Sequence, residues 1–114
     1  MPRANSSVPR HRRHKKVIKL AKGYWGARRK NYKTAKEAVE RGWLYAYRDR
    51  RQRKRDFRRL WITRINAAVR QYDMSYSVFI HKLHENNIKL DRKQLSEMAI
   101  REPQNFKKLV ESLK

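Results

Sequence analysis

Residues 48–72 read RDRRQRKRDFRRLWITRINAAVRQY, and the character of the chain changes within this stretch. Its first part, residues 48–59, holds eight basic side chains, which at about 100° per helical residue point to nearly every side of the axis. From Phe57 onward, apolar residues recur every three or four positions, as they do on the buried face of a helix. Between Asn31 and Met74 there is no proline and a single glycine, so we expect one long helix to run through the change of composition.

The positive charge of the chain is concentrated in its first half. The 114 residues carry 32 Lys and Arg side chains against 10 Asp and Glu, which gives a net charge of +22. Residues 1–59 hold 22 basic and four acidic side chains, and residues 60–114 hold 10 and six, so the two parts carry +18 and +4. We therefore predict an all-α protein in which a long basic helical N-terminal arm, residues 1–59, is followed by a small helical C-terminal domain, residues 60–114, that continues from the long helix.

The arm is expected to consist of four segments. Turn-forming residues before position 10 predict an irregular start, and the next breaker is a glycine, so a helix is predicted over about residues 10–22. Gly23 and Gly26 predict a bend at residues 23–26, and the long helix follows from about residue 31. A stripe of small side chains on that helix indicates close approach of another backbone. The stripe consists of Ala35, Ala38, Val39, Gly42 and Ala46.

A helix charged on every side is poorly stable alone. Like charges repel along it, and it has no apolar face to bury. Asp49 directed toward Arg53, and Asp56 directed toward Arg59, offset only part of this repulsion. We therefore expect this part of the arm to be surrounded by phosphate.

Three further helix starts are predicted after the long helix. Ser75 is a suitable N-cap, and Asp91 with Gln94 three residues later is typical of a capping box. Pro103 suits the first turn of a last helix. Apolar side chains at helical spacing follow each start, so we expect a compact bundle whose core includes Trp61.

Composition excludes several classes of function. Without cysteine the chain has no disulfide framework, thiolate nucleophile or cysteine-ligated zinc. Apolar runs such as residues 67–69 are far shorter than the roughly 18 residues that a membrane-spanning helix needs. The carboxylates stand alone, without a Ser/His/Asp order, a glycine-rich phosphate loop or an HExxH stretch, so we predict no enzyme, cofactor or small-molecule substrate. The absence of a transit-like leader favours synthesis in a bacterial cytoplasm or within an organelle.

Two pairs of histidines each place two imidazoles three residues apart. His11 and His14 lie among arginines that repel a cation, so phosphate contact suits them better than a metal ion. His81 and His84 have Glu85 nearby but no evident fourth ligand, so a solvent-exposed helix surface is favoured. We therefore predict no metal site.

Basic and aromatic side chains alternate through residues 10–64, which indicates a nucleic-acid interface. Arginine forms bidentate bonds with phosphate and stacks on bases, and aromatic rings stack on unpaired bases, so the mixture suits folded RNA. Tyr24 and Trp25 can equally pack on neighbouring helices, whereas packing is favoured for Trp43 and Tyr47, which share a helix face. The candidate RNA-binding residues are Arg3, Arg10, His11, Arg12, Arg13, His14, Lys15, Lys16, Lys19, Lys22, Tyr24, Trp25, Arg28, Arg29, Lys30, Arg48, Arg50, Arg51, Arg53, Lys54, Arg55, Arg58, Arg59 and Arg64.

The main alternative function is that of an architectural DNA-compacting protein, which would also be small, basic and helical. Such a protein needs inserted apolar wedges or a dimer interface on duplex DNA, whereas a helix charged on all sides fits burial within compact RNA better. A cationic helix at a membrane surface needs one broad apolar face, and residues 48–56 contain no apolar residue, so we predict no membrane partner.

Several motifs along the chain resemble one known family. They are AKGY at residues 21–24, YAYRDRR at 45–51, RKRDFRRLWITRINAA at 53–68, SYS at 75–77 and LDRK at 90–93. Together these motifs resemble the bacterial-type large-subunit ribosomal protein twenty family. The resemblance implies a structural protein of the large subunit that binds 23S-type ribosomal RNA directly and organises its helices in early assembly. It also implies contact with neighbouring large-subunit ribosomal proteins, and a cytoplasmic location in the ribosome of a bacterium or, alternatively, an organelle.

Overall fold

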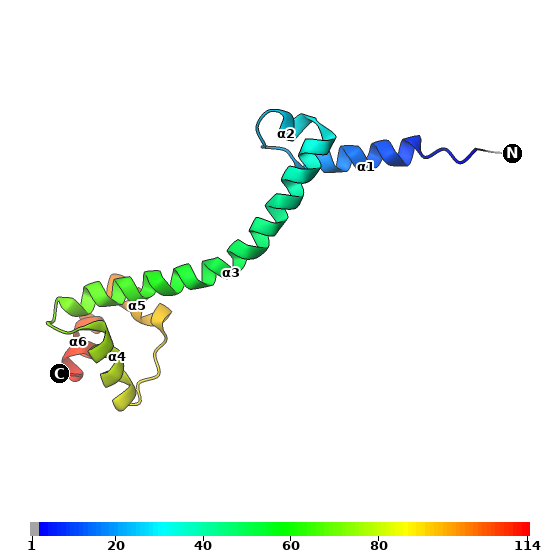
Figure 1. Cartoon of the computed structure of the whole chain (residues 1–114). Coiled ribbons are helices and arrows are strands. Elements are labelled where there is room, and N and C mark those ends of the chain that lie inside the picture. The colour runs from blue at the N-terminus through cyan, green and yellow to red at the C-terminus, as the bar shows by residue number, and fades with distance from the viewer. Residues whose placement is uncertain (1–2) are drawn as a thin grey trace. The chain divides into compact units, whose positions relative to one another are not determined.

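The computed structural model describes residues 3–114, and these form six α-helices and no β-strand (Figure 1). The helices are α1 Ser7–Leu20, α2 Ala27–Lys30, α3 Tyr32–Arg70, α4 Tyr76–Glu85, α5 Arg92–Arg101 and α6 Pro103–Ser112. The predicted all-α class with one long helix is confirmed. None of the six helices is long and apolar enough to cross a membrane. The described chain divides into two compact units, unit 1 up to Arg51 and unit 2 from Gln52 onward, and α3 contributes to both.

Unit 1 begins with a helix that starts earlier than about residue 10. Asn5 Oδ1 accepts hydrogen bonds from the backbone N–H of Ser7 at 3.1 Å and from its hydroxyl at 2.7 Å, which supports a helix start at Ser7. Pro9 then stands in the first turn, where its missing N–H is not needed. The expectation of irregular chain is therefore wrong for residues 7–9, and its first two residues lie outside the described part.

The bend at residues 23–26 has the backbone that its glycines predict. Gly23 has a φ of 92° and Gly26 a φ of 62°, both in the region that side chains disfavour. The following helix is interrupted once, because Asn31 is extended with a ψ of 124° and separates α2 from α3. The carbonyl of Asn31 accepts the N–H of Ala35 at 2.7 Å, so the same residue starts α3.

The small-residue stripe on α3 receives the chain segment that follows α1. Ala35 and Val39 are buried together with Ala21, and Tyr24 packs against this cluster. A Cβ added at Gly42 would lie 2.6 Å from Tyr24 Oη, closer than atoms pack, so glycine at this position leaves room for the Tyr24 hydroxyl. Another segment therefore covers the stripe, but the group that meets Gly42 is a side-chain hydroxyl and not the backbone that the sequence led us to expect, and the buried core of unit 1 is small.

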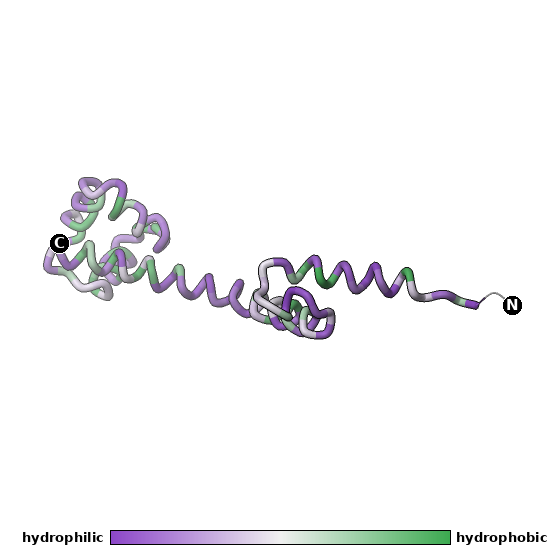
Figure 2. Tube along the Cα trace, turned by 90° about the horizontal axis from the view of Figure 1, so that it is seen from above, coloured by the Kyte–Doolittle hydropathy of each residue, from purple (hydrophilic) through white to green (hydrophobic). Residues whose placement is uncertain are grey.

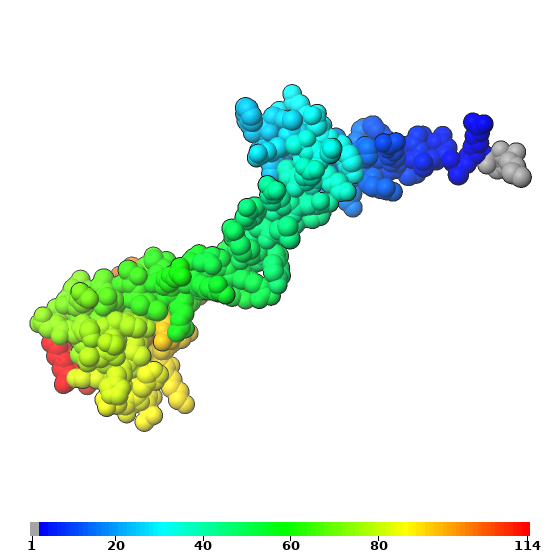
Figure 3. Space-filling view, viewed as in Figure 1, coloured from blue at the N-terminus to red at the C-terminus, as the bar shows by residue number. Residues whose placement is uncertain are grey.

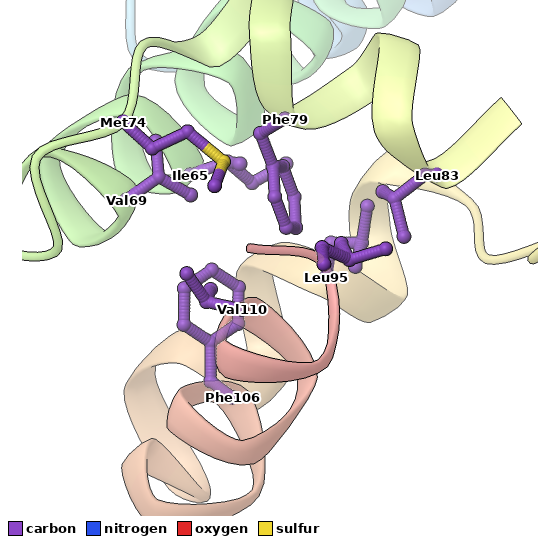
Figure 4. Close-up of a cluster of buried hydrophobic side chains, with 9 residues drawn as sticks. Ile65, Val69, Met74, Phe79, Leu83, Leu95, Phe106 and Val110 are labelled. Carbon is purple, nitrogen blue, oxygen red and sulfur yellow. The ribbon is translucent and has the colours of Figure 1, made fainter. Parts of the chain in front are cut away.

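Unit 2 has a larger core, which the last turns of α3 share with α4, α5 and α6. Figure 3 shows α4, in yellow-green, against the green C-terminal part of α3, and Figure 4 shows the apolar side chains pointing toward one another. The rings of Phe79 and Phe106 lie 5.8 Å apart at their centroids and are tilted by 47°. The buried cluster consists of Ile65, Val69, Met74, Phe79, Leu83, Leu95, Phe106, Val110 and Leu113.

Local hydrogen bonds determine where these helices start and stop. Asp73 has a φ of 57°, and Met74 N–H donates to Val69 O at 3.3 Å, which ends α3 in a Schellman turn and returns the chain to the core. Ser75 Oγ accepts from the N–H of residue 78 as the predicted N-cap of α4. The predicted capping box of Asp91 at the start of α5 is also present.

The prediction that Trp61 belongs to the core is wrong. Trp61 is half-buried and lies 6.0 Å from the ring of Phe57, which is itself 48% exposed, and neither belongs to the buried cluster. The physical reason is length, because α4 to α6 have ten residues each, about 15 Å, and cover only the last turns of α3. The covered part of the stripe begins at Ile65.

Ser96 provides a test of the packing of unit 2. Its side chain is fully buried on α5, and its hydroxyl has no hydrogen-bond partner. Burying a hydroxyl without a partner costs about 1–3 kcal/mol, so Ser96→Ala should raise the free energy of unfolding by about 1 kcal/mol. Chemical denaturation followed by circular dichroism measures this. A lower midpoint for Ser96→Ala would show that the hydroxyl is satisfied in solution.

Candidate nucleic-acid interface

Nearly all of the side chains predicted to bind RNA are exposed. Arg3 precedes α1, eight of them are on α1, three are in or next to the bend, three are on α2 and nine are on α3. Only His14 and Tyr24 are half-buried, and every other member of the set is exposed. These segments are also hydrophilic in composition, since α1 and the middle of α3 are largely purple in Figure 2.

The middle of α3 has no protein covering on any side. Apart from Gln52, all residues from 43 to 60 are exposed. Arg59 Nη1 lies 3.7 Å from Asp56 Oδ1, as predicted, whereas Asp49 pairs with its neighbour Arg48 at 2.9 Å and not with Arg53. Exposed ion pairs of this kind contribute about 0–1 kcal/mol each, so they leave most of the repulsion along the helix uncompensated.

Aromatic rings in this region are also exposed. Trp43 is 60% and Tyr47 56% exposed, so the packing favoured for this pair is not found within the described residues. No other helix of the unit covers their face of α3. The guanidinium of Arg48 lies 4.6 Å from the centre of the Tyr45 ring, and that of Arg51 lies 4.8 Å from the Tyr47 ring. These rings are therefore held by cations on one side and open on the other.

The two aromatic residues of the bend differ in their surroundings. The side chain of Tyr24 packs against α3, and its hydroxyl donates a hydrogen bond to Ala38 O at 3.4 Å. Trp25 is 91% exposed and packs on nothing in the described chain. The packing alternative thus applies to Tyr24, while Trp25 remains a candidate for stacking on a partner.

Five cations from separate parts of unit 1 meet around one surface concavity. Lys15 and Lys19 come from α1, Lys22 follows it, and Arg29 and Lys30 come from α2. Such a cluster offers several donors to phosphate oxygens from different directions. These residues are up to 15 positions apart in the sequence. The turn of the chain between α1 and α2 brings them together into the cluster.

His14 occupies a different place from the neighbouring His11. Its ring stacks on that of Tyr32 at the start of α3, with 3.7 Å between centroids and 13° between planes. His11 is exposed on α1. His14 therefore helps to hold α1 against α3, and only the edge of its ring remains for a phosphate.

A second concavity of about 480 Å³ lies between the bend and α3. The residues that line it include the aromatic Tyr24 and Tyr45, the basic Arg28 and Arg41, and the acidic Glu37. Arg41 and Glu37 line this concavity but are not among the candidate residues predicted from the sequence. The signal that points to them is positional, because each directly precedes a residue of the small-residue stripe, Glu37 before Ala38 and Arg41 before Gly42, and both therefore lie to the same side of it.

Comparison with known proteins identifies the family. The model of the ribosomal protein L20 family matches residues 3–109, which is nearly the whole chain. The chain belongs to the ribosomal protein L20 family. Two similar proteins are called large ribosomal subunit protein bL20. The one from Salinibacter ruber is 54% identical over 97% of this chain and 96% of its own length, and the one from Solidesulfovibrio magneticus is 59% identical over 91% and 89%.

The match to the ribosomal protein L20 family extends through both units. It begins at Arg3 and ends within α6, so it includes every candidate RNA-binding residue and the core of unit 2 except Val110 and Leu113. The resemblance seen in the sequence motifs is therefore confirmed.

Proposed function

We propose that this protein, as a member of the ribosomal protein L20 family, is a structural constituent of the large ribosomal subunit and binds its 23S-type RNA through residues 3–59. Its role in the cytoplasmic ribosome is structural and not catalytic. The observation that supports this binding mode is the exposure of nearly every cation on α1, α2 and the middle of α3. A helix with cations on all sides and no apolar face fits a site where RNA surrounds it.

The cations act by replacing counterions between RNA helices. Each phosphate neutralised on a duplex lowers the logarithm of the binding constant by about 0.9 per unit of the logarithm of salt concentration. Because cations on opposite sides of α3 contact different RNA segments, the helix holds those segments at a defined spacing. This is how the arm organises RNA in early subunit assembly, beside neighbouring large-subunit ribosomal proteins.

We further propose that the middle of α3 becomes stably helical only on RNA. An isolated helix of about 15 residues is marginal in water, and this one also has like charges along its length. The core of unit 1 contributes only three small buried side chains to its stability. Neutralisation by phosphate removes the repulsion that opposes the helix.

Hydrogen exchange of the whole protein tests this coupling. Amides of residues 43–58 should exchange at least about tenfold faster than those of α4 in the free protein, and should be protected when large-subunit RNA is added. Amides of α4 serve as the internal control, because the core of unit 2 protects them in both states. Equal protection of both segments without RNA would contradict the coupling.

Competition distinguishes this function from DNA compaction. Labelled protein bound to large-subunit ribosomal RNA should be displaced by unlabelled ribosomal RNA at much lower concentration than by duplex DNA. Sedimentation of the tagged protein in high-salt gradients should place it in large subunits and their precursors. Preference for duplex DNA, or association with the chromosome, would refute the assignment.

A further inference from the structure

The concavity between the bend and α3 brings three kinds of side chain together. Tyr24 packs against α3 and its hydroxyl donates to Ala38 O, so the side of the concavity that Tyr24 forms is fixed to the helix. Tyr45 also lines the concavity, and the guanidinium of Arg48 lies over its ring at 4.6 Å from the centroid. The volume of the concavity, about 480 Å³, is within the range of sites that take one small molecule or one nucleotide.

Glu37 is the unexpected member of this lining. Unit 1 carries a large positive charge and three carboxylates, of which Glu40 pairs with Lys36 at 3.9 Å and Asp49 with Arg48 at 2.9 Å. Among the described residues Glu37 forms no ion pair within 4 Å. Glu37 is exposed, and its carboxylate accepts hydrogen bonds and repels phosphate, so it favours a ligand that presents hydrogen-bond donors here.

We propose that this concavity binds one unpaired guanine of the RNA, a proposal that rests on the RNA-binding function above. The Watson–Crick edge of guanine has two adjacent donors, N1–H and the N2 amino group, which match the two oxygens of the Glu37 carboxylate. Adenine and cytosine offer one amino group beside an acceptor nitrogen, which the carboxylate repels. Uracil offers one N–H between two carbonyls. Guanine is therefore the base whose edge fits a carboxylate best.

The other lining residues fit the rest of a nucleotide. Unpaired bases stack on aromatic rings, and Tyr24 and Tyr45 provide two. Arg28 and Arg41 line the same concavity and can bond the phosphates on either side of the base. A base, its two phosphates and its donor edge thus each have a partner of suitable chemistry within unit 1.

Hairpin RNAs that differ in a single bulged nucleotide test the proposal with the full-length protein. Fluorescence anisotropy should give about tenfold tighter binding to a bulged guanosine than to a bulged inosine, which lacks the N2 amino group, or a bulged adenosine. Glu37→Gln should abolish this preference, because the amide keeps only one acceptor oxygen. The matched control is Glu40→Gln, which removes the same charge one turn away and outside the concavity and should retain the preference.

The outcomes separate this proposal from the general function. Equal affinity of the unmodified protein for all three hairpins, with ribosomal RNA still preferred over duplex DNA, would overturn the guanine site and leave RNA binding intact. Loss of the preference in both variants would also overturn it, since a change in charge alone would then explain the result. Failure to prefer ribosomal RNA over duplex DNA would refute the underlying function.

Discussion

Replacement of Arg50, Arg53, Lys54 and Arg55 by glutamine should weaken binding to large-subunit ribosomal RNA by on the order of 10³-fold at about 0.1 M salt. These four side chains are exposed on different sides of α3, and none of them forms an ion pair with a described residue. If each contacts a duplex phosphate, the slope of the salt dependence should fall by about 3.6, which is four times the value for one phosphate. Glutamine has nearly the same helix propensity as arginine, and the loss of like charges lowers the repulsion along α3, so weaker binding would not come from a weaker helix.

Filter binding over a range of salt concentrations measures both the affinity and the slope. The control variant replaces four exposed cations of the helices and loop of unit 2, namely Lys89, Lys93, Arg101 and Lys108, by glutamine. It changes the net charge of +22 by the same amount and should alter the slope by less than about one. The same loss in both variants would show that total charge, and not the arm, determines binding.

Phe79→Ala should leave unit 2 largely unfolded at 37 °C. The Phe79 ring is fully buried and packs on Phe106, and truncation of such a side chain costs about 3–5 kcal/mol. A domain of about 60 residues has a total stability of about 3–9 kcal/mol, so the loss is comparable to the whole. Thermal unfolding followed by circular dichroism should lose its cooperative transition.

Two further variants keep this prediction specific. Val78→Ala changes the neighbouring residue on α4, which is 45% exposed, and should cost no more than about 0.5 kcal/mol. The conservative pair Phe79→Leu and Phe106→Leu, combined in a double-mutant cycle, should give a coupling of about 0.5–1.5 kcal/mol for the two rings. Equal effects of Phe79→Ala and Val78→Ala would mean that the core does not close around Phe79 in solution.

The helix boundaries were the most predictable part of the fold, because their causes are local. The capping box at Asp91 and the N-cap at Ser75 involve partners three residues away, and Gly23 needs only its own positive φ. The early start of α1 and the break at Asn31 were not predicted. Proline is compatible with both irregular chain and a first turn, and asparagine with both a helix and an extended residue, so these two choices were ambiguous.

The candidate site was predictable in composition and less so in arrangement. Nearly every basic residue of the arm is exposed, so the residue type alone is enough to predict it as a candidate RNA-binding residue. Among the candidate residues Tyr24 and His14 are the exceptions, because each contacts a residue of α3 that is far away in the sequence. Tyr24 bonds the carbonyl of Ala38, 14 residues later, and His14 stacks on the ring of Tyr32, 18 residues later. The same return of the chain brings Glu37 and Arg41 into a concavity with Arg28.

The sequence by itself determined the helical class, most of the helix ends and the uneven distribution of charge, since all three follow from neighbours within about four residues or from composition. The tertiary structure decided which apolar side chains are covered and which charged ones converge. Ile65 is buried and Trp61 is not, although both lie on one stripe, because coverage depends on how far α4 to α6 extend along α3. Likewise the turn after α1 places Tyr24 over Gly42, where the absence of a side chain makes room for the Tyr24 hydroxyl.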